Sequence, residues 1–406
     1  MKYLKACFDK RGSYTVFLTI FLCGLMIFII AVIKASANLA IDSTTENFGR
    51  VWAKSIIAEY DRALKERYGF YGFYANEYMV EEKILYYAGK TTKGKDYLKT
   101  GECKVDLDGY KLMEMNTFLD QLTDTMLRGE IPNRSFFSAG ETETEAGHRY
   151  IAADWIINSL PSKNKESTVN TSIILNRVRR GDSLSSLANY AMVNNYIFKY
   201  FNNYVDYDEF KENTFFKNEV EYIITGKLDD ERARKNVYND LVALRNGLNL
   251  AYLYGCEEKL NMVRAIAELL TPGPEAEATA AMLLEMWAYA EAKNDLALLY
   301  DKKTVPLTKG DQNWALGFGS ILFGDSSGKN YVTPSCIEGI EYDKYLAILL
   351  ATVSEKTRVL RIMDLIQINL KYAYCDYFLL EDYYVGLNYS LVVNGRSHEF
   401  TEAYKK

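Results

Sequence analysis

The residue types that most often perform catalysis or bind metals are sparse in this sequence. Only two histidines are present, and neither His148 nor His398 lies near a cysteine or the other histidine at the spacing of a metal site. Gly317-Phe318-Gly319 does not continue into the G-x-G-x-x-G of a dinucleotide site, and no P-loop is found. We therefore predict that the chain is not an enzyme, and we assign no catalytic, cofactor-binding or metal residues.

Two short segments look like functional motifs but lack their second halves. Residues 181–184 read GDSL, as in a lipase-like family, yet the Asp-x-x-His that this family needs downstream is missing. We interpret Ser183 as a helix N-cap before Leu184. Residues 140–147 hold three glutamates and are interpreted as a solvated acidic loop, because their spacing is not that of a calcium-binding EF-hand.

The six cysteines do not form a recognisable metal or redox motif. Two of them fall in or before an apolar segment near the N-terminus. The other four are scattered, and either remain free thiols or form one or two disulfides, with three full pairings open. These four are Cys103, Cys256, Cys336 and Cys375.

Composition predicts a folded protein that does not bind nucleic acid. Apolar residues make up 49% of the chain, which is enough to build a substantial core. The formal net charge is −6, so there is no overall positive field to attract phosphates.

The N-terminal part carries one membrane-spanning segment. Tyr14–Ile33 is uncharged and about as long as the ~20 residues that a helix needs to cross the hydrocarbon of a bilayer. Residues 1–13 carry four basic side chains and one acidic side chain, so the positive-inside rule predicts a cytoplasmic N-terminus and an extracellular bulk. A cleaved secretory signal is the alternative, with Ala35-Ser36-Ala37 as its cleavage site.

The segment after the anchor is predicted to continue the same helix. Residues 34–68 contain no proline, and apolar side chains recur at every fourth position, which is typical of an amphipathic helix. Gly49 is the weakest point in this helix, and Gly69 supplies its stop. These apolar positions are Phe48, Trp52, Ile56, Tyr60 and Leu64.

The remaining chain is predicted to be α+β and mainly α, with a helical ectodomain, small β elements and a C-terminal hairpin. Residues 69–180 are mixed α/β and extracytoplasmic, with a strand in 101–110. Residues 181–310 are helical, and 311–406 hold a loop, a helix and a β-hairpin whose turn is Asn394-Gly395. The predicted helices are 184–205, 230–255, 260–270, 275–300 and 341–372, and 303–332 is predicted to be a long loop.

Several segments resemble a family of uncharacterised, mostly clostridial, membrane proteins encoded among tight-adherence (Tad, Flp-type) pilus genes. The similarity spans nearly the whole chain. It rests on residues 10–18 (KRGSYTVFL), 58–62 (AEYDR), 66–70 (ERYGF), 219–223 (EVEYI) with 226–227 (GK), 287–292 (WAYAEA), 305–307 (VPL) and 361–367 (RIMDLIQ).

This resemblance implies a TadE/TadG-like role as a minor pilin-like or pilus-assembly component. It also implies prepilin-type processing after Gly12, with Ser13 as the new N-terminus. Typical prepilins carry a glutamate five residues after the cut, whereas this chain has Phe17, which puts processing and fibre incorporation in question. In such a role Phe17, Phe21 and Leu25 would be packing positions of the membrane helix.

The leading functional hypothesis is therefore a single-pass, extracytoplasmic pilus-associated protein that acts by structural packing and protein–protein contacts. Its expected partners are the lipid bilayer, other pilus-system subunits and further copies of itself, and no cofactor is expected. The alternative is an anchored binding or sensing ectodomain without catalysis, which a pocket lined by convergent polar groups would favour.

Overall fold

The computed structural model describes residues 10–133, 184–207, 214–323 and 331–404. It is mainly helical with two small antiparallel sheets, which confirms the predicted fold class. The chain divides into two compact units. Unit 1 comprises residues 1–60, 72–111 and 382–406, and unit 2 comprises residues 61–71 and 112–381. Each unit is described below by itself.

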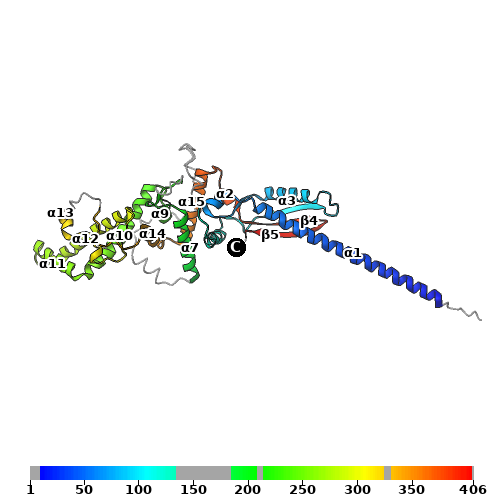
Figure 1. Cartoon of the computed structure of the whole chain (residues 1–406), viewed down its shortest axis with the longest axis horizontal. Helices are drawn as coiled ribbons and strands as arrows, with labels where there is room; N and C mark the ends of the chain where they lie inside the picture. Colours follow the sequence, from blue (N-terminus) through cyan, green and yellow to red (C-terminus); the bar gives the residue numbers. More distant parts are fainter. Residues whose placement is uncertain (1–9, 134–183, 208–213, 324–330, 405–406) are drawn as a thin grey trace, which may run out of the picture. The chain divides into compact units, whose positions relative to one another are not determined.

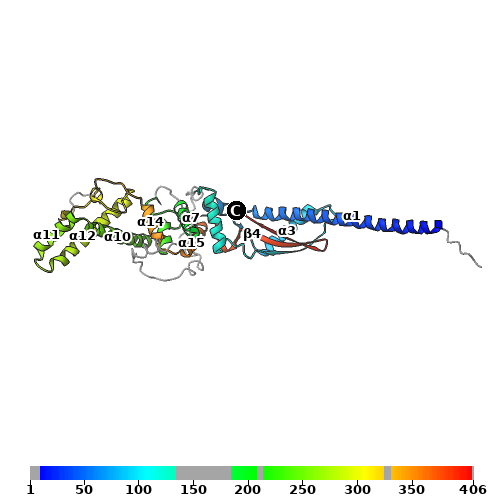
Figure 2. The ribbon, with the colours of Figure 1, turned by 90° about the horizontal axis from the view of Figure 1, so that it is seen from below.

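Unit 1 is built on one long helix and a three-stranded antiparallel sheet (Figures 1 and 2). Its helices are α1 (Lys10–Ile57) and α3 (Glu77–Thr92). The sheet has the order β2-β4-β5, formed by β2 (Thr100–Asp106), β4 (Gly386–Val393) and β5 (Arg396–Ala403). Two further short strands, β1 (Phe73–Tyr74) and β3 (Tyr383–Tyr384), pair with each other.

The C-terminal hairpin forms as predicted. Val393 pairs with Arg396, and Asn394 and Gly395 both have positive φ, at 51° and 80°. Positive φ at both central residues is the geometry of a type I′ turn, which suits the right-handed twist of two-residue hairpins. The predicted strand around Val105 also forms, and it pairs with β4.

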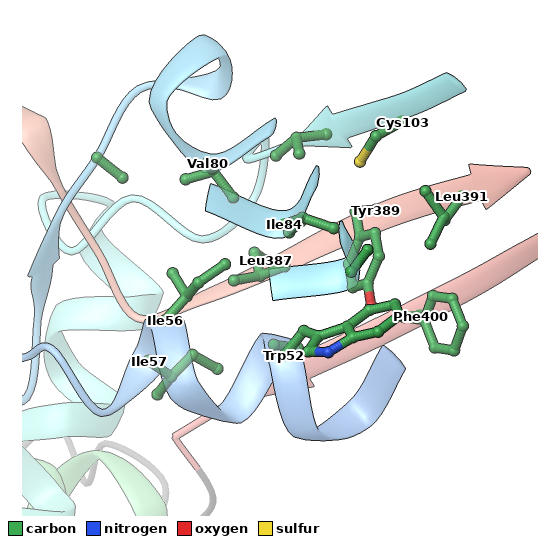
Figure 3. Packing of buried hydrophobic residues seen from close by; sticks show 14 of the residues in the cluster. Trp52, Ile56, Ile57, Val80, Ile84, Cys103, Leu387, Tyr389, Leu391 and Phe400 are labelled. Carbon is green, nitrogen blue, oxygen red and sulfur yellow. The ribbon is translucent and has the colours of Figure 1, made fainter. Parts of the chain in front are cut away.

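The core of unit 1 lies between the two helices and one face of the sheet. Every second residue of β4, from Leu387 to Val393, is buried and faces the helices. Figure 3 shows Trp52 of α1 packed toward Tyr389 and Phe400, and Ile56 of the same helix toward Leu387. This alternation is the expected pattern of an antiparallel sheet with one buried face and one solvated face.

The long helix ends earlier than the sequence pattern suggested. We predicted continuous helix through residue 68, but α1 ends at Ile57 and α2 (Arg62–Tyr68) is separate. Asp61 has extended backbone angles, and its side chain accepts a hydrogen bond from Leu64 N at 2.8 Å, so it starts a new helix as an N-cap. The break coincides with the boundary between the two units.

Unit 2 is helical. Its longer helices are α4 (Met115–Leu127), α7 (Leu184–Tyr200), α10 (Asp230–Gly255), α11 (Glu257–Leu270), α12 (Ala276–Tyr300), α14 (Tyr342–Leu350) and α15 (Glu355–Ala373). Shorter ones are α2, α9 (Glu219–Thr225), α13 (Phe318–Phe323) and the 3₁₀ turns Asp311–Asn313 and Leu380–Asp382. All residues of α15 from Ile362 to Leu370 are buried, so it forms the centre of this unit.

The predicted helix 184–205 ends at Tyr200, and two further predictions for unit 2 need correction. The segment 341–372 is not one helix, because α14 ends at Leu350 and Ser354 caps α15 by accepting a hydrogen bond from Thr357 N. The predicted long loop 303–332 contains α13, where Phe318 packs against Trp287. In both places a local cap or a tertiary contact overrides the residue pattern.

Candidate functional site

The first half of α1 is the most distinctive surface of the chain. Within Tyr14–Ile57, its most apolar stretch has a mean hydropathy of 3.1 and is 0% buried, so this helix is long and apolar enough to span a membrane. It is the one such helix among the residues that the structure describes. The predicted packing positions Phe17, Phe21 and Leu25 are 68%, 58% and 43% exposed. They are spaced four residues apart, so they form one stripe along the helix.

The second half of the same helix is built into unit 1. Tyr389 Oη donates a 2.7 Å hydrogen bond to the carbonyl of Gly49, and the ring of Phe400 occupies the place where a Cβ at Gly49 would lie. Arg396 pairs with Asp42 at 3.0 Å. Gly49 is therefore a point of close approach between α1 and the sheet, which explains why a helix-weakening residue stands there.

The proposed processing position lies at the start of this helix. Gly12 and Ser13 have helical backbone and lie in the first turn of α1, which begins at Lys10. Processing after Gly12 stays a prediction.

The other residues that the sequence singled out do not converge. His398 lies 3.9 Å from Asp42, whereas His148, Ser183 and the glutamates of 140–147 fall outside the described residues. Within the described ranges, no three or more His, Cys, Asp or Glu side chains are grouped as they would be around a metal ion. The five described cysteines are free thiols, and burial raises the pKa of Cys103 to about 12.

Unit 2 contains a cluster of buried carboxyl groups that sequence reasoning missed. Glu219 and Glu221 lie on α9 and are fully buried. Glu219 accepts hydrogen bonds from Asn202 N at 2.8 Å and Asn369 Nδ2 at 2.6 Å. Glu221 Oε1 accepts from Tyr204 N at 3.0 Å and Tyr342 Oη at 2.8 Å. These bonds fix three chain segments around one short helix.

Burial changes the acidity of these groups. It raises the pKa of Glu221 to about 7, against an ordinary value of 4.5, although its two hydrogen bonds work in the opposite direction. The pKa of Asp364 on α15 is likewise raised to about 7 by burial, with the hydrogen bond from Tyr222 and the charge of Arg361 opposing it. Glu221 Oε2 and Asp364 Oδ1 have no hydrogen-bond partner in the structure.

The arginine beside Asp364 ties α15 to the end of α9. Arg361 Nη1 donates to the carbonyls of Ile223 and Ile224, at 2.7 and 2.9 Å. Gly226 ends α9 with a φ of 68°, and a side chain there would collide with the Arg361 guanidinium. The family-like segments 219–227 and 361–367 therefore meet in space, and they do so for packing and capping.

A second buried cluster holds the segment after α12. Arg245 of α10 pairs with Asp295 of α12 at 2.9 Å and donates to the carbonyls of Pro306 and Leu307 at 2.9 Å. Lys309 lies 2.6 Å from both Asp295 and Glu291. All four charged side chains are at most 1% exposed.

Glu291, also in this cluster, binds the C-terminal end of the segment that follows α12. Its carboxylate accepts hydrogen bonds from the backbone N–H groups of Ala315 and Leu316, both at 2.8 Å. Residues 305–316 are thus fastened to α10 and α12 by charged groups at both ends. We interpret both clusters as structural, because their polar groups are directed at the backbone of their own unit and are closed to solvent.

One surface pocket of about 230 Å³ lies next to the first cluster. Tyr342, whose hydroxyl donates to Glu221, forms part of its wall. Val205 and Leu299 also line it, and the remaining lining residues carry charges of both signs: Lys302 and Lys303, and Asp206, Glu341 and Asp343. Polar side chains from three segments of unit 2 therefore converge on this open space.

Comparison with known proteins adds a family but no activity. A sequence profile described as a family of unknown function (DUF5702) matches residues 150–395, which is more than half of the chain. No curated protein and no solved structure matches the chain. The matched region covers α7 to α15, both buried clusters and strands β3 and β4. The chain therefore belongs to the family of unknown function DUF5702.

Proposed function

We propose that this chain is a single-pass membrane protein whose bulk lies outside the cytoplasm, and that it acts as a minor pilin-like or assembly component of a Tad-type pilus. In this role it works by structural packing and protein–protein contacts and performs no catalysis. The proposal combines the resemblance stated above with one structural observation. The first half of α1 is exposed and apolar, whereas its second half packs into unit 1.

That observation carries the proposal. A single uninterrupted helix runs from Lys10 to Ile57; the apolar side chains of its first half are exposed, and its second half forms one wall of the unit 1 core. A helix that lies in lipid at one end and is packed onto a folded head at the other is the arrangement of pilins. It lets the same element serve as a membrane anchor and, after leaving the bilayer, as a packing surface between subunits.

The membrane helix provides the decisive test. A pilin-like protein needs the identity of the side chains on α1, because van der Waals packing decides helix association inside lipid. Replacing Tyr14–Ile33 with a leucine–alanine span should abolish pilus assembly or adherence in the source cell, while membrane insertion and folding of both units persist. Unchanged assembly with this span would refute the pilin-like role.

Processing and topology are tested separately. Gly12→Val should block cleavage, and mass spectrometry of the native membrane fraction should find Ser13 as the mature N-terminus. A start at Met1 would indicate an unprocessed anchor, and a start near Asn38 a secreted protein. Protease added to cells lacking a wall should degrade the chain beyond residue 40, whereas full protection would contradict the proposed orientation.

The pocket beside Tyr342 favours the second candidate function, an anchored binding ectodomain. Lysines and carboxylates face one open space there, which suits a small ligand carrying both charges. A ligand of this kind at 100 times its dissociation constant stabilises the folded state by about 2.7 kcal/mol. A thermal-shift screen of free amino acids and short peptides against the full chain would detect it, and loss of the shift in Lys303→Gln would place the ligand in this pocket.

A further inference from the structure

The end of unit 1 nearest the apolar half of α1 is basic and aromatic. Residues 93–99 (KGKDYLK) contain three lysines and one aspartate, in a chain whose net charge is −6. Lys93 and Lys99 are exposed, and Tyr97 is 55% exposed. A local excess of positive charge in an acidic protein points to a specific anionic partner for this surface.

Several contacts show at which end of unit 1 these residues lie. Strand β5 runs parallel to α1, because Arg396 pairs with Asp42 and Phe400 lies against Gly49. The β4–β5 turn, which precedes Arg396, is therefore at the end of the sheet nearer the apolar segment. Figures 1 and 2 show this turn and the α3–β2 connection on the side of unit 1 from which the apolar half of α1 extends.

The α3–β2 connection is fastened to the same turn. The side chain of Asn394 accepts a hydrogen bond from Lys99 N at 2.9 Å and donates one to Tyr97 O at 2.7 Å. The backbone N–H of Asn394 donates to Lys99 O at 2.9 Å. Lys95 lies over the ring of Phe48 on α1, with 4.3 Å between Nζ and the ring centroid. Residues 93–99 and 394–396 thus form one built surface, which we call the basic rim.

The basic rim is close enough to a bilayer to meet its headgroups. Asp42 lies nine positions beyond Ile33, the last residue of the uncharged run, which corresponds to about 14 Å along an upright helix. The turn lies on the membrane side of Arg396, and lysine side chains reach further still. The headgroup layer extends about 5–8 Å beyond the hydrocarbon, and the Debye length at physiological salt is about 8 Å.

We propose that the basic rim binds the anionic phospholipid headgroups of the leaflet from which α1 emerges, so that unit 1 rests on the membrane surface. This inference rests on the proposed membrane anchor. The lysines supply attraction to lipid phosphate, and Tyr97 supplies an amphipathic ring of the kind that gathers at membrane interfaces. Lipid is the favoured partner because α1 joins the basic rim to the membrane-spanning segment without a break and so keeps it beside the headgroups.

The test uses the full-length chain in nanodiscs and measures how fast each lysine reacts with an amine-labelling reagent. In discs with about one third phosphatidylglycerol, Lys95 and Lys99 should react about fivefold more slowly than in pure phosphatidylcholine, and the effect should disappear at high salt. Lys104, on the solvated face of the same sheet with a 72% exposed side chain, is the internal control and should react equally in both.

Matched charge reversals check that the rim acts as a unit. Lys99→Glu should lower the lipid-dependent protection of Lys95, whereas Lys54→Glu, an exposed position further along α1, should not. Equal labelling of Lys95 and Lys99 in both lipids would overturn the proposal. So would protection in neutral discs by added soluble glycerol phosphate alone, since the partner would then be a soluble anion. Failure of the chain to insert into either disc would instead refute the membrane anchor itself.

Discussion

The buried carboxyl group of Glu221 predicts how the stability of unit 2 changes with pH. This side chain is fully buried between Tyr204 and Tyr342, with the charge of Asp230 adding repulsion, and its pKa is raised from 4.5 to about 7. Below pH 4.5 the group is protonated in both the folded and the unfolded state, so it does not lower the free energy of unfolding. As the pH rises from 4.5 to 7, the carboxyl group ionises in the unfolded state but stays protonated in the folded state. The free energy of unfolding therefore falls over this range and levels off above pH 7.

The size of this effect follows from the pKa difference. A change of about 2.5 pH units corresponds to about 3 kcal/mol of unfolding free energy, lost between pH 4.5 and the region above pH 7. Glu221→Gln removes the ionisation but keeps the acceptor for Tyr204 N and Tyr342 Oη. Its amide group replaces Oε2, which makes no hydrogen bond in the structure. The variant should therefore be similar to the parent near pH 5 and more stable by up to about 3 kcal/mol near pH 8.

Urea unfolding of the full chain in detergent, followed at a series of pH values by near-UV circular dichroism, measures this difference. Trp287 and Trp314 pack edge to face in unit 2 and report its unfolding. Glu258→Gln, an exposed acid on α11 of the same unit, is the matched control and should change nothing. If the curves for the parent and Glu221→Gln stay parallel from pH 4.5 to 8.5, the raised pKa and its cause are wrong.

Three further predictions concern packing. Gly49→Ala should destabilise unit 1 by about 1–3 kcal/mol in urea unfolding, because the new methyl group overlaps the Phe400 ring, whereas Gly89→Ala, with open space on α3, should be neutral or stabilising by about 0.5–1 kcal/mol. Lys309→Met should cost about 3–5 kcal/mol of unit 2 stability, since it leaves the buried Glu291 without an ion-pair partner and Asp295 with Arg245 alone, and a smaller loss would contradict the charged state of Glu291. Gly395→Ala should cost about 1 kcal/mol through its φ of 80°, measured as a lower thermal midpoint for unit 1, and an unchanged midpoint would argue against the type I′ turn.

Much of the local structure was predictable because local rules determine it. The helix 230–255 was predicted with the bounds that α10 has, since an acidic first turn and a regular apolar face define it. The hairpin followed from Asn394-Gly395 and the two strand-like segments that flank it. The early end of α1 was missed because Asp61 reads equally well as a solvated helix residue and as an N-cap. The N-cap role follows from the boundary between the two units at Asp61, which is a tertiary feature that the local sequence does not show.

The buried clusters were not predictable from sequence. Glu219 and Glu221 stand on a seven-residue helix where acids are usually solvated, and the side chains that enclose them come from segments more than 100 residues away, as with Tyr342 and Asn369. Arg245 and Asp295, which form an ion pair, are 50 residues apart in the sequence. The nearest hint was that family-like segments contain these acids, but a resemblance does not say whether a residue is buried.

The unbroken backbone of α1 couples rotation at its two ends. Each residue of an α-helix advances the chain by 1.5 Å and turns it by about 100°. Because Gly49 and Asp42 fix the sheet to one side of α1, the stripe of Phe17, Phe21 and Leu25 points in a set direction relative to the basic rim. One residue inserted between Ile33 and Asn38 would leave composition and length almost unchanged, yet it would swing unit 1 by about 100° around the helix axis. The length of this segment therefore fixes the angular position of unit 1 about the axis of α1. A neighbouring protein that binds the stripe would also determine which side of unit 1 faces it.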